Sequence, residues 1–127
     1  MGKAAKQTIL VVDDEKTIRR LAVDELKAHG YEVLAAGSGA EALALLHGHE
    51  GEIHLLLTDV SMPGMSGGEL AEVVGAEREG MKILYMSGFG AGAALHDGVR
   101  EAGVAFLAKP FVPATLVKKV RAVLAGA

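Results

Sequence analysis

The chain contains no cysteine, so disulfide bonds, thiolate metal sites and thiol catalysis are excluded. Aromatic residues make up only 4% of the sequence, and 13 basic residues do not outnumber 16 acidic ones, which argues against direct binding to nucleic acid. No apolar run approaches the roughly 20 residues that cross a bilayer, and no long apolar segment follows the basic first residues as in a secretory signal. We therefore expect a cytoplasmic protein that has no membrane segment.

The overall composition of the chain is that of an ordinary globular domain. The chain has 127 residues, of which half are hydrophobic, and a formal net charge of -3. This length suits one domain with a single sizeable core. No linker or change of composition divides the sequence, so we expect a flexible leader over residues 1–7 and one domain over residues 8–125.

Short apolar segments alternate with segments of helical periodicity. Strands are expected at 8–12, 31–36, 53–58, 83–86 and 104–108. Helices are expected after each strand; the fourth, within 88–102, is the weakest because it is rich in glycine. The apolar face of the first helix is expected to consist of Ile18, Leu21, Ala22 and Leu26. This alternation predicts an α/β fold, a parallel sheet with helices on both faces.

Three helix starts carry different signals. Ser38 with Glu41, and Ser66 with Glu69, have the spacing of a capping box. Pro113 suits the first turn of the last helix, but Val112 stands where a capping side chain is expected. The last helix should therefore begin without a side-chain cap.

Polar residues follow the ends of four expected strands. They are Asp13 and Asp14, Asp59, Ser87 and Lys109. Because the carboxyl ends of parallel strands meet at one edge of the sheet, these residues should gather in one site. Clustered carboxylates repel one another, and a divalent cation with a preference for hard oxygen ligands, Mg²⁺, relieves the repulsion.

The charges of such a site favour phosphoryl transfer. Three aspartates contribute about -3, and Mg²⁺ with Lys109 contributes about +3, so the site can accept a phosphoryl group. Asp59 is the expected nucleophile, because a carboxylate that forms an aspartyl-phosphate is a recognised route. Lys109 and the Ser87 hydroxyl would contact the phosphoryl oxygens.

Four segments resemble the receiver domains of two-component response regulators, the CheY-like superfamily. They are residues 9–15, 57–67, 84–88 and 106–111, in this order and spacing. The resemblance implies a flavodoxin-like doubly wound (βα)5 fold with strand order 2-1-3-4-5. It also implies that Asp59 takes a phosphoryl group from the phosphohistidine of a histidine kinase or a phosphotransfer protein. Mg²⁺ would be held by Asp13, Asp14, Asp59 and the backbone carbonyl of Ser61.

The resemblance further implies a conformational switch. Ser87 and Phe106 would be its hydroxyl and its aromatic ring, and Lys109 would contact the phosphoryl group, with a cis peptide before Pro110. The face of the fourth helix, fifth strand and fifth helix would then bind a downstream partner or output domain. Such a domain is a signalling module rather than an enzyme, limited to self-phosphorylation from phosphodonors and slow autodephosphorylation.

The sequence leaves several matters open. Because it stops after its last helix, we expect no output domain; a stand-alone regulator, a piece of a hybrid kinase and a weak homodimer all stay open. A phosphorylation-silent interaction module is an alternative, although the site residues argue against it. A haloacid dehalogenase phosphatase would need a second aspartate where Ser61 stands, and a flavin or nucleotide binder would not have the acids of 13–15 in its phosphate loop. His47 and His49 lack a third ligand and are expected to be solvent-exposed.

Overall fold

A computed structural model of the chain describes residues 6–88 and 105–126. The described strands are β1 (Thr8–Val12), β2 (Glu32–Ala36), β3 (Leu55–Asp59), β4 (Lys82–Ser87) and β5 (Ala105–Ala108). The described helices are α1 (Lys16–Ala28), α2 (Gly39–Gly48), α3 (Gly67–Glu77) and α5 (Pro113–Leu124). The expected helix within 88–102 and most of the expected leader lie outside the described residues.

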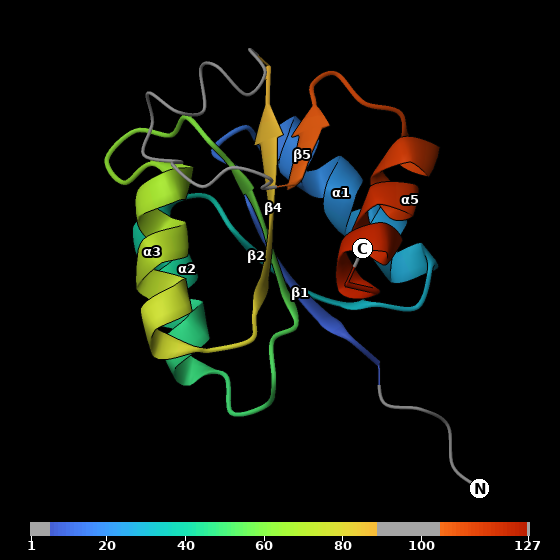
Figure 1. Cartoon of the computed structure of the whole chain (residues 1–127). Coiled ribbons are helices and arrows are strands. Elements are labelled where there is room, and N and C mark those ends of the chain that lie inside the picture. The colour runs from blue at the N-terminus through green and yellow to red at the C-terminus, as the bar shows by residue number, and fades with distance from the viewer. Residues whose placement is uncertain (1–5, 89–104, 127) are drawn as a thin grey trace, which may run out of the picture.

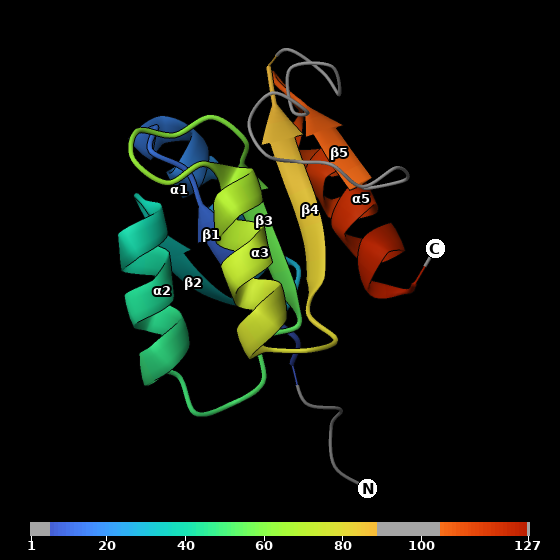
Figure 2. The same cartoon turned by 60° about the vertical axis from the view of Figure 1, so that its left-hand side comes forward.

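All five strands are parallel and form one sheet in the order β2-β1-β3-β4-β5. The helices α1 and α5 cover one face of the sheet, and α2 and α3 cover the other (Figures 1 and 2). This arrangement confirms the doubly wound fold and the strand order that the sequence predicted. None of the described helices is long and apolar enough to span a bilayer.

Two apolar layers hold the sheet between its helices. Side chains that alternate along β1 and β3 point to opposite layers: Ile9 and Leu57 pack with α1 and α5, whereas Leu10 and Leu56 pack with α2 and α3. Every residue of β3 is buried, as expected for a central parallel strand covered on both faces. The core therefore fixes the strand whose last residue is Asp59.

Several expected boundaries were wrong by one or two residues. The second strand begins one residue later than expected, the third begins at Leu55 and includes Asp59, and the fourth is one residue longer at each end. The expected start of the fifth strand at 104 lies outside the described residues. Ile53 is buried but makes no strand, because apolar packing does not require ladder pairing. Directly before β3, the side chain of His54 binds the start of β1, since its Nδ1 accepts the Thr8 N–H at 2.9 Å.

The helix starts and faces also refine the expectations. Ser66 and Glu69 form a complete capping box, whereas Glu41 Oε1 accepts the N–H of Gly37. In α2 only the Ser38 half of the box is therefore present. As predicted, Val112 gives α5 no side-chain cap. Leu21 is 36% exposed and does not belong to the core, because α1 points only part of its expected face at the sheet.

Candidate phosphoryl-transfer site

The register of the sheet brings the four polar strand ends together. Asp59 pairs with Met86 of β4, so Ser87 lies one residue beyond it on the neighbouring strand. The N–H of Lys109 donates to the Ser87 carbonyl at 3.0 Å, which places the end of β5 beside that of β4. On the other side, the Asp13 N–H donates to the carbonyl of Ala36 at 3.2 Å, at the end of β2. The expected convergence at the carboxyl edge is present in the structure.

Asp13 is held from several directions. Its side chain is completely buried, its backbone carbonyl accepts Arg19 Nη1 at 2.6 Å, and its Oδ1 accepts the Glu15 N–H at 2.9 Å. Its Oδ2 lies 2.8 Å from Lys109 Nζ, but within 6–88 and 105–126 no donor meets this oxygen in hydrogen-bond geometry. The Lys109 ammonium group therefore balances the charge of this buried oxygen.

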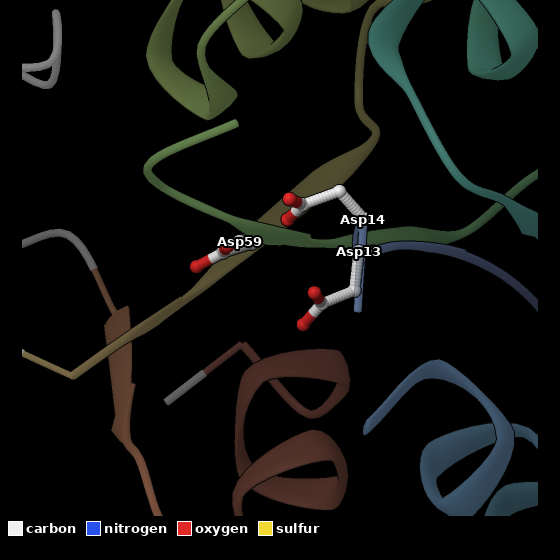
Figure 3. Close-up of side chains that lie close together, drawn as sticks. All are labelled: Asp13, Asp14 and Asp59. Atoms are coloured by element: carbon white, nitrogen blue, oxygen red, sulfur yellow. The ribbon is translucent and has the colours of Figure 1, made fainter. Parts of the chain in front are cut away.

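Asp13, Asp14 and Asp59 form one carboxylate cluster. Each offers an oxygen, and these oxygens lie within 4.8 Å of one another. Figure 3 shows the three side chains extending from the ends of β1 and β3 toward a common space. Asp14 is exposed whereas Asp13 and Asp59 are buried, so the cluster opens to solvent on one side. Oxygen ligands of this kind suit a hard divalent cation.

Lys109 supplies the positive charge of the site. Its Nζ lies 2.8 Å from Asp13 Oδ2, 3.3 Å from Glu15 Oε1 and 3.4 Å from Asp59 Oδ1. Burial alone would lower the pKa of Lys109, but Asp13 and Asp59 outweigh that effect, so the pKa is raised above its ordinary value. The peptide bond between Lys109 and Pro110 is cis.

The carboxyl group of Asp59 is less acidic than an ordinary aspartate. Burial raises the pKa of Asp59 to about 6, with Lys109 opposing the shift and the charges of Asp13 and Asp14 adding to it. The charges of Asp13 and Asp14, which add to this shift, also favour the binding of a cation that would stabilise the ionised form. Above about pH 6 the group carries the charge that a nucleophile needs.

The loop after β3 is fixed by close backbone contact. The Gly67 N–H donates to the Val60 carbonyl at 2.8 Å, and a Cβ at Gly67 would lie 2.1 Å from the Asp59 carbonyl oxygen. Only glycine therefore allows α3 to start this close to the end of β3. The capping box of Ser66 and Glu69 then secures the first turn of the helix. Together these contacts hold the segment that carries Ser61 beside the carboxylates.

A cavity of about 490 Å³ opens over the carboxylates. It is lined by Asp14, Glu15, Ile18, Asp59, Ser61, Ser87, Gly88, Lys109 and Pro110. All the expected site residues except Asp13 and Phe106 thus border one space. Phe106 lies on β5 and packs against Tyr85 of β4, with the ring centroids 5.6 Å apart.

Sequence reasoning missed two contributors to the site. Glu15 was visible in the acidic run 13–15 but received no role, and nothing in the sequence indicated that Arg19 would bind the Asp13 carbonyl. His47 and His49 join no metal cluster in the described part of the chain. However, His47 is not simply solvated, because its Nε2 lies 2.6 Å from Glu77 Oε1.

The fold and this site define a class of protein, and comparison with known families agrees. The chain belongs to the response regulator receiver domain family, whose model matches residues 9–121. It is a phosphoacceptor receiver domain of two-component signalling.

Individual relatives span different lengths. A chemotaxis protein CheY homolog from Campylobacter jejuni is 37% identical over 119 residues, covering 91% of each chain. The sensor kinase CckA of Brucella abortus is 33% identical over 117 residues, but the chain spans only 12% of its length. The structure of Vibrio cholerae CheY4 matches with a TM-score of 0.83 and 31% identity, covering 94% of this chain and 99% of that one.

Proposed function

We propose that Asp59 accepts a phosphoryl group from the phosphohistidine of a histidine kinase or a histidine phosphotransfer protein. The observation that carries this proposal is the position of Asp59 at the carboxyl edge, with Lys109 Nζ 3.4 Å away and the Asp13 and Asp14 carboxylates in the same cluster. A nucleophile, an amine and two further carboxylates lie together in one site, and phosphoryl transfer relies mainly on such positioning and charge.

The carboxylates fit Mg²⁺ as the cation of the site. Asp13, Asp14 and Asp59, with the backbone carbonyl of Ser61, would hold it, and the three carboxylate oxygens within 4.8 Å of one another support this choice. When bound, the cation supplies positive charge to the transferring phosphoryl oxygens. Lys109, whose Nζ lies 2.8 Å from Asp13 Oδ2, would supply a second positive charge beside the cation.

The chain's own residues then carry the transfer. The ionised Asp59 carboxylate attacks phosphorus, an oxygen–phosphorus bond forms, the nitrogen–phosphorus bond to the donor imidazole breaks, and the imidazole leaves with its electron pair and takes up a proton. Lys109, now shared between Asp13 and Asp59, pairs with the phosphoryl oxygens. The Ser87 hydroxyl, which borders the cavity, donates to another. Slow hydrolysis in the same pocket returns the free carboxylate.

The response to phosphorylation passes through β4 and β5. Ser87 moves toward the phosphoryl group, and the ring of Phe106, packed against Tyr85, shifts into the space that this movement leaves. The downstream partner then binds a surface that includes β5 and α5, to which the expected helix of 88–102 would contribute. The cytoplasm remains our prediction for the location of the protein.

The test is intact mass measurement after incubation with a small phosphodonor and Mg²⁺. The wild-type chain should gain the mass of one phosphoryl group, and Asp59→Asn should gain none. An adduct that persists in Asp59→Asn would place the acceptor elsewhere. An unchanged mass in both chains would instead favour the phosphorylation-silent interaction module, and steady release of phosphate from unrelated phosphoesters would favour a phosphatase.

A further inference from the structure

Glu15 borders the cavity but has no part in the proposed transfer. Its side chain is 64% exposed, yet its Oε1 reaches Lys109 Nζ at 3.3 Å across a separation of 94 residues. It lies at the mouth of the cavity, directly after the exposed Asp14. Lys109 therefore contacts three carboxylates rather than the two that the transfer uses.

The charges of the cavity do not cancel once Glu15 is included. The site holds four carboxylates: Lys109 Nζ contacts those of Asp13, Glu15 and Asp59, and Asp14 lies in one cluster with Asp13 and Asp59. A divalent cation and Lys109 together balance three of them. The fourth charge remains, and Glu15 is the member of the set that neither belongs to the carboxylate cluster nor accepts the phosphoryl group.

We infer that Glu15 is a specificity-determining residue whose charge strengthens cation binding and disfavours phosphodonors that carry the larger negative charge. This inference rests on the proposed function of Asp59. One negative charge at the mouth attracts a cation and repels an incoming anion, and the repulsion grows with the charge of the donor. Removing the charge should therefore change the two properties in opposite directions.

Two small donors of different charge test the inference. Acetyl phosphate is a dianion near pH 7, whereas phosphoramidate carries a net single negative charge. With saturating Mg²⁺ and low salt, Glu15→Gln should speed phosphorylation by acetyl phosphate roughly fivefold and by phosphoramidate roughly twofold, as expected for a partly screened charge several ångströms from the donor. In the same variant the dissociation constant for Mg²⁺, measured by titration calorimetry without any donor, should rise about threefold.

Two further variants separate charge from other causes. Glu79→Gln makes the same change of net charge on the loop that leads to the start of β4, at the opposite edge of the sheet, and should alter neither property. Glu15→Asp keeps the charge but draws it away from Lys109, and should keep the wild-type preference between donors. Denaturation curves of all variants check that each is folded.

The outcomes are distinct. Equal acceleration with both donors, unchanged Mg²⁺ affinity in Glu15→Gln, or the same acceleration in Glu79→Gln would each overturn the inference. Loss of the donor preference in Glu15→Asp would also overturn it, because the contact with Lys109 rather than the charge would then be responsible. If the wild-type chain takes phosphate from neither donor, the proposed function fails as well, whereas a phosphorylated wild type with an unchanged ratio in Glu15→Gln removes this inference alone.

Discussion

Polar groups at the carboxyl edge of the sheet, where the strands end, are paired differently from those at the amino edge, where the strands begin. At the carboxyl edge, Lys109 Nζ contacts the carboxylates of Asp13, Glu15 and Asp59, and the Asp14 carboxylate lies in the same cluster as those of Asp13 and Asp59. At the amino edge, where α2 and α3 end and lead back to β3 and β4, polar groups have matched partners. Arg78 donates to three carbonyl oxygens, those of Leu46, His49 and Gly51, at 2.6 to 2.9 Å.

The difference indicates where the fold is stabilised and where it is reactive. A charge with complete hydrogen bonding stabilises the folded state, whereas like charges held together cost free energy until a ligand arrives. The amino edge should therefore lose stability when a polar group is removed. The carboxyl edge should gain stability when the charge of Asp59 is removed and lose phosphoryl transfer at the same time.

The largest expected effect is at Arg78. Its guanidinium satisfies carbonyls at the end of α2, including that of Leu46 in the last helical turn, where the helix itself offers no donor. Arg78→Ala should lower the free energy of unfolding by about 2–3 kcal/mol, because several charge-assisted hydrogen bonds are lost together. Urea denaturation of both chains measures this change in the free energy of unfolding.

A lysine at the same position provides the control for Arg78. Arg78→Lys keeps the charge but cannot reach all three carbonyls with one ammonium group, so it should recover about half of the loss. Full recovery would show that charge alone stabilises this edge. A loss below about 0.5 kcal/mol in Arg78→Ala would contradict the proposed difference between the two edges.

A smaller effect of opposite sign is expected at Asp59. Folding raises its pKa from 3.8 to about 6, so the folded state binds the proton more tightly than the unfolded state does. Stability therefore falls as pH rises from about 4 to about 6, and the cost persists at higher pH. In metal-free buffer at pH 8, Asp59→Asn should be more stable than wild type by roughly 1–2 kcal/mol, allowing for partial solvation and the lost contact with Lys109.

The stability difference between wild type and Asp59→Asn should depend on pH and on Mg²⁺. Below about pH 3 the two chains should unfold at similar urea concentrations, since Asp59 is then mostly protonated in both the folded and the unfolded state. Saturating Mg²⁺ at pH 8 should reduce the difference in free energy of unfolding between the two chains, because it stabilises wild type more than Asp59→Asn. A variant that is less stable than wild type at pH 8 without metal would show that the contact with Lys109 outweighs the cost of the buried charge.

The carboxyl edge was largely predictable from the sequence, and the amino edge was not. The acids, Ser87 and Lys109 directly follow apolar strands, so the strand pattern and the parallel topology together place them at one edge. This reasoning does not depend on side-chain rotamers. It did not reveal that Glu15 would reach Lys109, because the contact depends on how the side chain crosses the cavity mouth.

The contacts of Arg78 had no sequence signal. They depend on the path of the loop between α2 and β3, which no periodicity describes, and on the relative positions of two helix ends. The second capping box shows a related limit. Ser38 and Glu41 have the same spacing as Ser66 and Glu69, but Glu41 accepts the Gly37 N–H instead. Spacing predicts which groups are within reach, and the local backbone decides which of them bond.

The smallest expected effect comes from the pair His47 and Glu77, which joins the ends of α2 and α3. The pair is short, at 2.6 Å, but the side chains are 58% and 41% exposed, so water and salt screen it. A double-mutant cycle with His47→Asn and Glu77→Gln should give a coupling free energy of about 0.2–1 kcal/mol at pH 6, and less in 0.5 M salt. If the coupling approached the loss in Arg78→Ala, exposed charge pairs rather than the hydrogen bonds to carbonyls would stabilise the amino edge, and the contrast between the edges would rest on a different interaction.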